Sequence, residues 1–305
     1  MIVRSLLLGM SESAWLREHA TRWPFVRRAV SRFMPGEMLA DMLAAARVLR
    51  DAGIEAVFTK LGENVASAAE AEAVARHYVE AVATVRAAGL GAEPSVKLTQ
   101  LGLDIDRDRA WRHLQTVAEA AHAAGLYLWI DMEQSRYVDV TLDLAERARA
   151  EFRDVGVCLQ AYLYRTEQDL DRMLRAGVGV RLVKGAYQEP ASLAFPKKAD
   201  VDRSFEALGG RMLEQRAARV VFGTHDAALI ARLCDRARAL GAPPRSYEFH
   251  FLYGIQRAEQ ARLVAAGEGV RVLVAYGDYW FPWYMRRLAE RPANVWFVLR
   301  SLVGG

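Results

Sequence analysis

Short apolar runs alternate with longer amphipathic segments along the chain from about residue 54 onward. Each of the eight runs is followed by a segment in which apolar positions recur with helical spacing. The runs are Ala56–Lys60, Ser95–Leu98, Leu126–Asp131, Val155–Leu159, Val178–Val183, Arg219–Gly223, Tyr247–Phe249 and Val270–Ala275. This alternation is typical of βα units around a parallel sheet, and eight units close a barrel. We therefore predict an α/β fold of the (βα)8, TIM-like type over residues 53–305.

Helical segments flank the predicted barrel on both sides in the sequence. In residues 1–52, the turn-forming string Met34–Glu37 separates a Trp- and Arg-rich portion from the amphipathic run Met38–Arg50. We expect this region to form an N-terminal helical cap packed on the barrel. Residues Tyr279–Arg291 predict one more helix, which ends before a proline. Because there is no linker, repeat or low-complexity tract, residues 1–305 are predicted to form a single domain.

Composition and charge narrow the class of protein. The chain has 305 residues, of which 52% are hydrophobic, so it can bury a full core without metals or disulfides. The net charge of +4, from 41 basic and 37 acidic residues, is spread along the chain and does not point to a nucleic-acid partner. So small an excess fits either a solvated surface or peripheral contact with an anionic membrane.

Cysteine spacing and the lengths of apolar runs bear on location. Cys158 and Cys234 have no partner at the spacing of a metal site or a redox motif, which favours a reducing compartment. No stretch approaches the ~20 apolar residues of a membrane span. We expect a cytoplasmic protein, with peripheral attachment to the inner face of the cell membrane as the alternative location.

Polar side chains recur where the predicted strands end. In barrels of this kind the strand C-termini converge on one open mouth, where reactive groups collect. The polar residues at these positions are Thr59, Lys60, Lys97, Asp131, Gln160, Arg181, Lys184, Thr224, His225, Asp226, Glu248 and His250. Any one of them could be a surface charge or a helix cap, and Asp226 stands where an N-cap would. Their recurrence at strand after strand predicts one functional site at the mouth.

The segment Arg181–Tyr187 brings two cations, Arg181 and Lys184, and a glycine to the end of one strand. Such a segment suits an anionic group, a phosphate included, that needs close approach of the backbone. A turn glycine flanked by basic side chains that reach into solvent explains the same residues. Both interpretations stay open at this point. The string Thr224–Asp226 adds a hydroxyl and an imidazole at the same mouth.

The adjacent residues Arg286 and Arg287 share a predicted helix with Glu290. Two forked guanidinium donors suit a carboxylate ligand. Adjacent arginines also occur on solvated helix faces. The strongly apolar string that precedes them, residues 280–285, favours a helix that faces a ligand.

Several common sequence motifs of metal, nucleotide and hydrolase sites are absent from the sequence. The six histidines are dispersed, and neither HExxH nor CxxC is present, so we expect no metal site. The absence of GxGxxG and GxSxG removes a Rossmann nucleotide site and a hydrolase elbow. Any cofactor must therefore bind at the mouth of the barrel.

Seven strings make a comparison with known families specific. They are Ser95–Gly102, Ile130–Glu133, Leu159–Tyr162, Arg181–Tyr187, Thr224–Asp226, Glu248–Gly254 and Arg286–Glu290. In content and in order, they resemble the corresponding strings of the monofunctional bacterial proline dehydrogenases. The resemblance covers nearly the whole chain, as far as Leu299–Leu302.

This resemblance implies a distorted (βα)8 barrel that binds FAD non-covalently at the strand C-termini. It implies oxidation of L-proline to 1-pyrroline-5-carboxylate by hydride transfer to FAD, the first step of proline catabolism. A small cyclic amino acid is then the substrate, and a membrane quinone or another acceptor takes the electrons. The charged residues agree with this chemistry, because cations can hold a carboxylate and stabilise reduced flavin.

Roles for individual residues also come with the resemblance. Asp131 and Arg181 would be catalytic, with Arg181 near flavin N5. The substrate would contact Lys97, Arg286, Arg287, Leu273 and Thr59, the first three through its carboxylate. The flavin would contact Met132, Gln160, Arg181, Val183, Lys184, Gly185, Ala186, Tyr187, Thr224, His225, Asp226, His250, Leu252 and Glu290.

Four positions depart from the family pattern. Thr59 stands where an aspartate is usual, and Leu273 where a tyrosine packs on the substrate. His250 replaces a glutamine, and Trp283 replaces a tyrosine. Losing a tyrosine ring beside the substrate widens one wall of the pocket, although Trp283 can refill part of it. The identity of the substrate ring is therefore open.

Three hypotheses about function follow from these observations. The protein is a proline dehydrogenase, a relative that oxidises a ring-substituted proline or another cyclic secondary amine, or a flavin-binding barrel that does not turn over. The first two are favoured by the retained cations Lys97, Arg181, Arg286 and Arg287.

Overall fold

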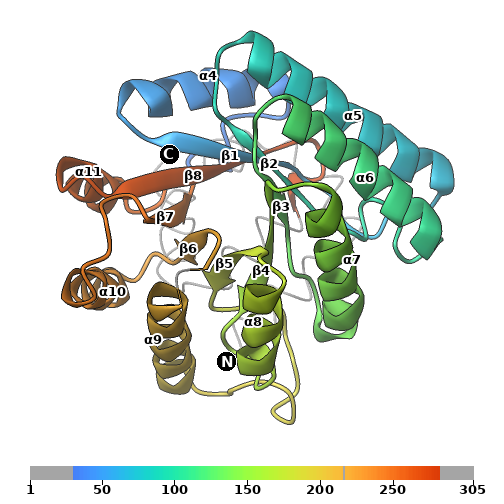
Figure 1. The fold of residues 1–305 in the computed structure, drawn as a ribbon. Coiled ribbons are helices and arrows are strands. Elements are labelled where there is room, and N and C mark those ends of the chain that lie inside the picture. Colours follow the sequence, from blue (N-terminus) through green and yellow to red (C-terminus); the bar gives the residue numbers. More distant parts are fainter. Residues whose placement is uncertain (1–29, 216, 282–305) are drawn as a thin grey trace, which may run out of the picture.

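Eight parallel strands close into a barrel in the order of the sequence, and β8 pairs with β1 to complete the ring. The structure is a computed structural model that describes residues 30–215 and 217–281. Figure 1 shows the strands at the centre with helices around them. The strands are β1 (Glu55–Lys60), β2 (Glu93–Val96), β3 (Leu128–Ile130), β4 (Val155–Gln160), β5 (Gly179–Val183), β6 (Val220–Gly223), β7 (Tyr247–Leu252) and β8 (Gly269–Tyr276). The predicted (βα)8 barrel is confirmed.

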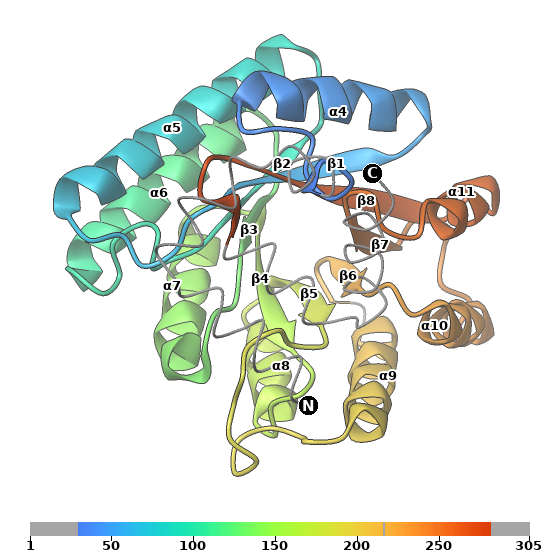
Figure 2. The ribbon, with the colours of Figure 1, turned by 180° about the vertical axis from the view of Figure 1, so that it is seen from behind.

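Helices cover the outside of the barrel (Figures 1 and 2). They are α4 (Leu39–Asp51), α5 (Ala68–Ala87), α6 (Arg107–Ala123), the short 3-10 helix η1 (Ser135–Tyr137), α7 (Val138–Glu151), α8 (Thr166–Arg175), α9 (Lys198–Glu214), α10 (Ala227–Ala239) and α11 (Arg257–Ala265). The amphipathic run Met38–Arg50 is confirmed as helix α4, which packs on β1 and β8 where the ring closes. The remainder of the predicted cap, residues 1–29, and the predicted helix beyond Phe281 lie outside the described residues.

The interior of the barrel is filled below its mouth. Val57 of β1, Trp129 of β3 and Val221 of β6 form one buried layer inside the ring. The next residue of β1, Phe58, packs outward on Tyr78 of α5, with ring centroids 6.2 Å apart. Adjacent residues of a strand point to opposite faces, so each strand serves both the barrel interior and the helices around it.

The strand bounds differ from the prediction most at β2 and β7. β2 spans Glu93–Val96 rather than Ser95–Leu98. Glutamate and proline are poor strand formers, but Glu93 is buried and paired with Arg219 inside the barrel, which overrides that preference. β7 continues to Leu252, beyond the predicted end at Phe249. Both strands still end at the mouth, and His250 keeps its predicted place there. The prediction that Glu248 lies at the mouth is wrong, because β7 continues to Leu252 and leaves Glu248 near the start of the strand.

Candidate active site

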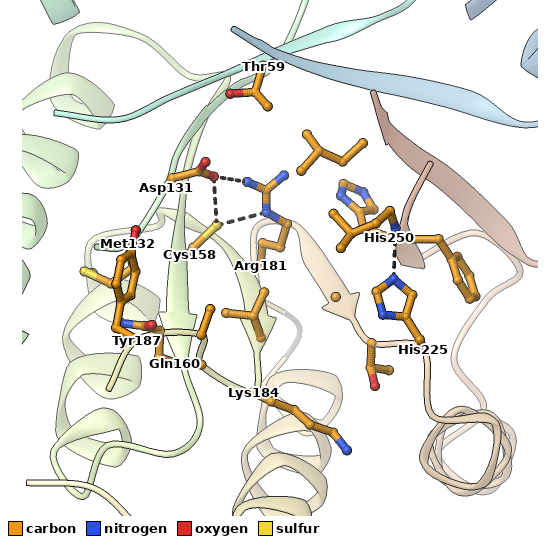
Figure 3. Close-up of a pocket in the computed structure, with 18 of the residues that line it drawn as sticks. Thr59, Asp131, Met132, Cys158, Gln160, Arg181, Lys184, Tyr187, His225 and His250 are labelled. Atoms are coloured by element: carbon orange, nitrogen blue, oxygen red, sulfur yellow. Dashed lines mark hydrogen bonds and ion pairs between the residues drawn. The ribbon is translucent and has the colours of Figure 1, made fainter. Parts of the chain in front are cut away.

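A cavity of about 630 Å³ lies at the mouth of the barrel, between the C-terminal ends of the strands (Figure 3). Of the polar residues predicted at the strand ends, Lys60 and Glu248 do not line this cavity. All residues of the described part with a predicted catalytic, substrate-binding or flavin-binding role do line it. These are Thr59, Lys97, Asp131, Met132, Gln160, Arg181, Val183, Lys184, Gly185, Ala186, Tyr187, Thr224, His225, Asp226, His250, Leu252 and Leu273. The other three predicted residues, Arg286, Arg287 and Glu290, lie outside the described residues. The structure therefore brings the predicted set to one place, while the contact of each residue with a ligand stays a prediction.

Residues that the sequence analysis did not single out also line the cavity. They are Leu61, Gly62, Glu63, Cys158, Lys198, Gly223, Ala227, Phe251, Gln256 and Tyr279. Leu61, Gly223, Ala227 and Phe251 are direct neighbours of predicted residues in the chain. Cys158 is not such a neighbour. It stands at position i−2 relative to Gln160 in β4, and alternate residues of a strand point to the same face. That spacing was the signal that could have identified it.

Five side chains form a hydrogen-bonded group in the wall of the cavity, which we call the mouth cluster: Ser95, Lys97, Asp131, Cys158 and Arg181. Asp131 follows β3, and its two oxygens lie 2.7 Å from Lys97 Nζ and 2.5 Å from Arg181 Nη2. The hydroxyl of Ser95 donates to Asp131 at 2.8 Å and accepts from Arg181 at 2.7 Å. Arg181 Nε donates to the sulfur of Cys158 at 2.9 Å. Four neighbouring strands thus contribute to one cluster.

The mouth cluster carries a surplus of one positive charge. Burial alone would raise the pKa of Asp131, but Lys97 and Arg181 outweigh burial and hold that pKa well below its usual range. Burial alone would lower the pKa of Lys97, but the Asp131 carboxylate raises it above its usual range. Two cations therefore share one carboxylate at neutral pH. Such a site attracts an anionic ligand group.

The segment after β5 combines a turn glycine with an ion-paired lysine. Gly185 has a φ of +115°, and a side-chain carbon there would lie 2.3 Å from the ring of Tyr162, so the backbone requires glycine. Lys184 Nζ lies 2.5 Å from Asp202 and 3.1 Å from Asp226. The predicted turn at this glycine is confirmed. The expectation that the basic side chains beside it reach into solvent is wrong, because Arg181 is buried and Lys184 is ion-paired. The anion-binding interpretation of the segment stays a prediction.

Hydrogen bonds with the backbone fix the side chains of His225 and Asp226, which follow β6, and of Gln160 at the end of β4. His225 Nε2 accepts from the amide of Leu252 at 2.9 Å, which places the proton of a neutral imidazole on Nδ1. Asp226 accepts from the amide of Leu229 at 3.4 Å and is the N-cap of α10. The predicted cap is confirmed. In β4, Gln160 Nε2 donates to the carbonyl of Glu133 at 2.9 Å, which fixes its side chain at the cavity wall.

Two of the positions that depart from the family pattern lie deep in the cavity. Thr59 is buried, and its hydroxyl lies 3.4 Å from that of Tyr78. Leu273 packs on the layer that contains Trp129. An aliphatic side chain and a short hydroxyl therefore stand where the family pattern has larger or charged groups. Trp283 lies outside the described residues.

His250 lies between the cavity and the bottom of the barrel. It is 5% exposed, and neither ring nitrogen makes a hydrogen bond to the described residues. Its Nε2 lies 3.5 Å from Glu248, and its ring meets the ring of Trp129 edge-on. Burial lowers the pKa of His250 to about 3, against the opposite effect of Glu248. The side chain is therefore neutral at neutral pH.

A second ionic group, the floor cluster, lies at the other end of the strands and consists of Glu93, Arg219, Glu248 and Arg271. Glu93 lies 2.7 Å from Arg219 and 3.3 Å from Arg271. Glu248 lies 2.7 Å from each of the same two arginines. The indole of Trp129 donates to Glu93 at 2.8 Å, which joins this cluster to the buried layer above it.

The chemistry of the cavity wall fits a flat cofactor with apolar faces and an anionic end. Met132, Val183 and Leu252 supply apolar surface, and Arg181 and Lys184 supply cations beside it. The glycine-specific turn at Gly185 brings backbone to the same wall. These are the features that a flavin nucleotide needs from the residues that hold it.

The closed barrel and the charged cavity at its C-terminal face define an enzyme of the TIM-barrel class. The chain belongs to the proline dehydrogenase family, because the family model described as Proline dehydrogenase matches residues 42–300. It is 34% identical over 302 residues to Proline dehydrogenase 2 of Bacillus subtilis (strain 168), with 99% of each chain covered. It is also 34% identical over 279 residues to the Proline dehydrogenase of Deinococcus radiodurans, with 90% of each chain covered.

A solved structure shares the fold. The proline utilization A (PutA) protein of Bdellovibrio bacteriovorus, inactivated by N-propargylglycine, matches 95% of this chain with a TM-score of 0.83 and 21% identity. The match covers 36% of that longer chain. At this identity the likeness concerns the barrel itself.

Proposed function

We propose that the protein oxidises L-proline to 1-pyrroline-5-carboxylate with FAD as its cofactor, the first step of proline catabolism. The observation that carries this proposal is the mouth cluster, in which Lys97 and Arg181 share Asp131 and leave a positive charge at the cavity wall. Family membership supports the reaction. The surplus charge supports a substrate that carries a carboxylate beside its reacting ring.

The proposal assigns some residues of the cavity to the flavin and others to the substrate. When bound, the flavin would supply the hydride acceptor. Lys184, Gly185 and His225 would hold its ribityl and phosphate portion, and Arg181 would stand near the reacting nitrogen. Lys97 has three N–H donors and uses one on Asp131, so its others can bind the substrate carboxylate together with Arg286 and Arg287.

The proposal predicts a direction of pH dependence. The ring carbon beside nitrogen can release a hydride only when the substrate amine is neutral, because the protonated amine has no lone pair to form the C=N bond. The rate of flavin reduction should therefore rise with pH until the bound amine is deprotonated. A flat profile through that range contradicts the proposal.

Anaerobic flavin reduction is the direct test. The purified holoprotein should be yellow, and L-proline added without oxygen should bleach the flavin absorbance. D-proline and L-alanine are matched controls that carry the same charges as L-proline. D-proline has the opposite configuration at the α-carbon, and alanine lacks the ring. A yellow protein that no cyclic amino acid bleaches would instead support the flavin-binding barrel without turnover.

Leu273 favours a second candidate function, the oxidation of a ring-substituted proline or another cyclic secondary amine. It is aliphatic, and it packs on the apolar layer under the cavity, where it leaves more room than a tyrosine ring. Bleaching by hydroxylated, methylated or six-membered analogues, measured beside L-proline, separates the two candidates. Proline remains our first choice because the chain matches the proline dehydrogenase family over most of its length.

The proposal also covers the electron acceptor, the cellular location and the domain organisation of the protein. Within the described ranges, no helix is long and apolar enough to cross a membrane. We assign the electrons to a quinone, the location to the cytoplasm with peripheral contact to the inner face of the cell membrane, and residues 1–305 to one catalytic domain. Co-sedimentation with anionic vesicles, and reoxidation of reduced protein by a soluble quinone, test the first two assignments. Limited proteolysis tests the third.

A further inference from the structure

The guanidinium of Arg181 is held along one edge only. Its Nη2 donates to Ser95 and Asp131, and its Nε donates to Cys158. None of the described residues hydrogen-bonds Nη1. The ring of Trp129 lies under the group, with its centroid 5.0 Å from the guanidinium carbon. The occupied edge therefore faces the protein, and the remaining nitrogen is left for a ligand (Figure 3).

Cys158 supplies the second fixed point on that edge. Ser95 and Asp131 both contact Nη2, so without Cys158 the described residues would hydrogen-bond the guanidinium at that nitrogen alone, and its orientation would depend on the side-chain torsions and on the ring of Trp129. Cys158 and Arg181 are direct partners in the β4–β5 pairing, which sets their side chains next to each other inside the barrel. Two anchored nitrogens fix the plane of a guanidinium, as in bidentate recognition.

The thiol of Cys158 can accept a hydrogen bond from Arg181 and donate one to Asp131. Its sulfur accepts from Arg181 Nε at 2.9 Å and lies 3.6 Å from an oxygen of Asp131, to which its S–H donates. Burial raises the pKa of Cys158 to about 11, so the thiol keeps its proton. A thiolate would repel Asp131, whereas the neutral thiol bridges the cation and the anion.

We propose that Cys158 is a positioning residue of the active site, whose thiol joins Arg181 Nε to the Asp131 carboxylate and so fixes the guanidinium at the cavity wall. This inference rests on the proposed function for its catalytic consequence. Its structural part, the orientation of Arg181, does not depend on which amine is oxidised.

Three full-length holoproteins test the role of the thiol: Cys158→Ala, Cys158→Ser and Cys234→Ala. Alanine and serine have nearly the same volume, so the first two differ in the hydroxyl that can replace the thiol as donor and acceptor. Cys234, in α10, is buried like Cys158 but lies outside the cavity lining, and its variant controls for the loss of a buried thiol. Thermal unfolding of each variant measures the cost to folding separately.

Cys158→Ala should lower kcat for proline about tenfold, the size of one hydrogen bond to a charged group, with a smaller change in KM. The midpoint potential of its bound flavin should become more negative, because a displaced cation stabilises reduced flavin less. Cys158→Ser should recover most of both losses. Cys234→Ala should match the parent protein in potential and kcat.

Two outcomes overturn the inference. Equal flavin potentials in Cys158→Ala and Cys234→Ala show that Cys158 does not position the cation, and a serine variant as impaired as the alanine variant shows that its volume alone matters. The potential is measured without proline, so it is independent of the proposed substrate. If proline fails to bleach the parent protein while the potential shifts as expected, the proposed function fails and the positioning role stands.

Discussion

The mouth cluster and the floor cluster are both buried groups of oppositely charged side chains inside one barrel. They differ in whether the carboxylates match all of the cations. In the floor cluster, Glu93 and Glu248 each contact both Arg219 and Arg271, and Arg271 also pairs with the exposed carboxylate of Glu55. In the mouth cluster, Lys97 and Arg181 share the one carboxylate of Asp131. A group whose cations are all matched by carboxylates has no positive charge left for an anionic ligand, whereas a group with a surplus cation beside a cavity has.

The difference indicates which cluster serves stability and which serves chemistry. The layer that contains Trp129 separates them, with Arg181 on one side of its ring and Arg219 5.4 Å from its centroid. Side chains of the same types therefore have different tasks at the two ends of the strands. Substitutions at the floor should act on folding, and substitutions at the mouth should act on the reaction.

The largest effect is expected at the floor. Arg219→Ala leaves Glu93 and Glu248 short of a buried partner and should lower the free energy of unfolding by about 3–5 kcal/mol. Denaturant unfolding measures this, with Arg238→Ala as the control, because the pair of Arg238 with Asp235 is exposed and should contribute less than about 1 kcal/mol. Equal losses in the two variants would show that the floor cluster does not support the fold.

At the mouth, Arg181→Lys should slow the reaction strongly while it lowers the free energy of unfolding only a little. Lysine keeps the charge, but one nitrogen cannot reach Cys158, Ser95 and Asp131 together, so flavin reduction by proline should slow about 100-fold. Stopped-flow absorbance measures the rate, and denaturant unfolding of the same variant should show a smaller loss than Arg219→Ala. A variant that unfolds easily but reduces its flavin at the parent rate reverses the assignment of the two clusters.

His250, between the two clusters, should make folding sensitive to acid. Its pKa is lowered to about 3 in the folded protein, below the ordinary histidine value of 6.5, so the unfolded chain binds more protons between these pH values. The stability contributed by neutral His250 is complete above about pH 6.5 and is lost as the pH falls. From pH 7 to pH 5 the parent should lose about 1–2 kcal/mol more than His250→Gln. Parallel pH profiles of unfolding free energy would contradict this.

The smallest effect concerns the ring pocket beside the mouth cluster. Leu273→Tyr restores an aromatic wall and should shift the ratio of kcat/KM for proline over a ring-hydroxylated proline toward proline by about fivefold. Steady-state assays with both substrates measure the ratio. An unchanged ratio would place the ring elsewhere in the cavity.

Sequence patterns predicted the barrel and most of the cavity lining, because strand ends and family strings are local features. They did not predict the pairing of Lys97 with Asp131, which depends on how β2 and β3 lie beside each other. They also did not indicate a role for Cys158, because all of β4 is buried and shows no alternation of polar and apolar positions.

The floor cluster was missed for a related reason. Glu93 and Arg219 stand at the beginnings of strands, where charged residues usually face solvent. Only closure of the ring brings Glu93 of β2 to Arg219 and Arg271, which come from the opposite part of the sequence. Long-range charge pairs of this kind have no signature within a window of neighbouring residues.

The pairing of β1 with β8 also sets the order of assembly. Glu55 to Lys60 align with Arg271 to Tyr276, so the ring closes only after the last strand has been synthesised. Until then β1 and β7 each present an open edge, which is prone to pair with other chains. Contacts between such distant residues form slowly, because a long loop must close first. Synthesis on the ribosome should therefore leave an aggregation-prone intermediate that persists until β8 emerges, and a chaperone that covers β1 would raise the yield of folded enzyme.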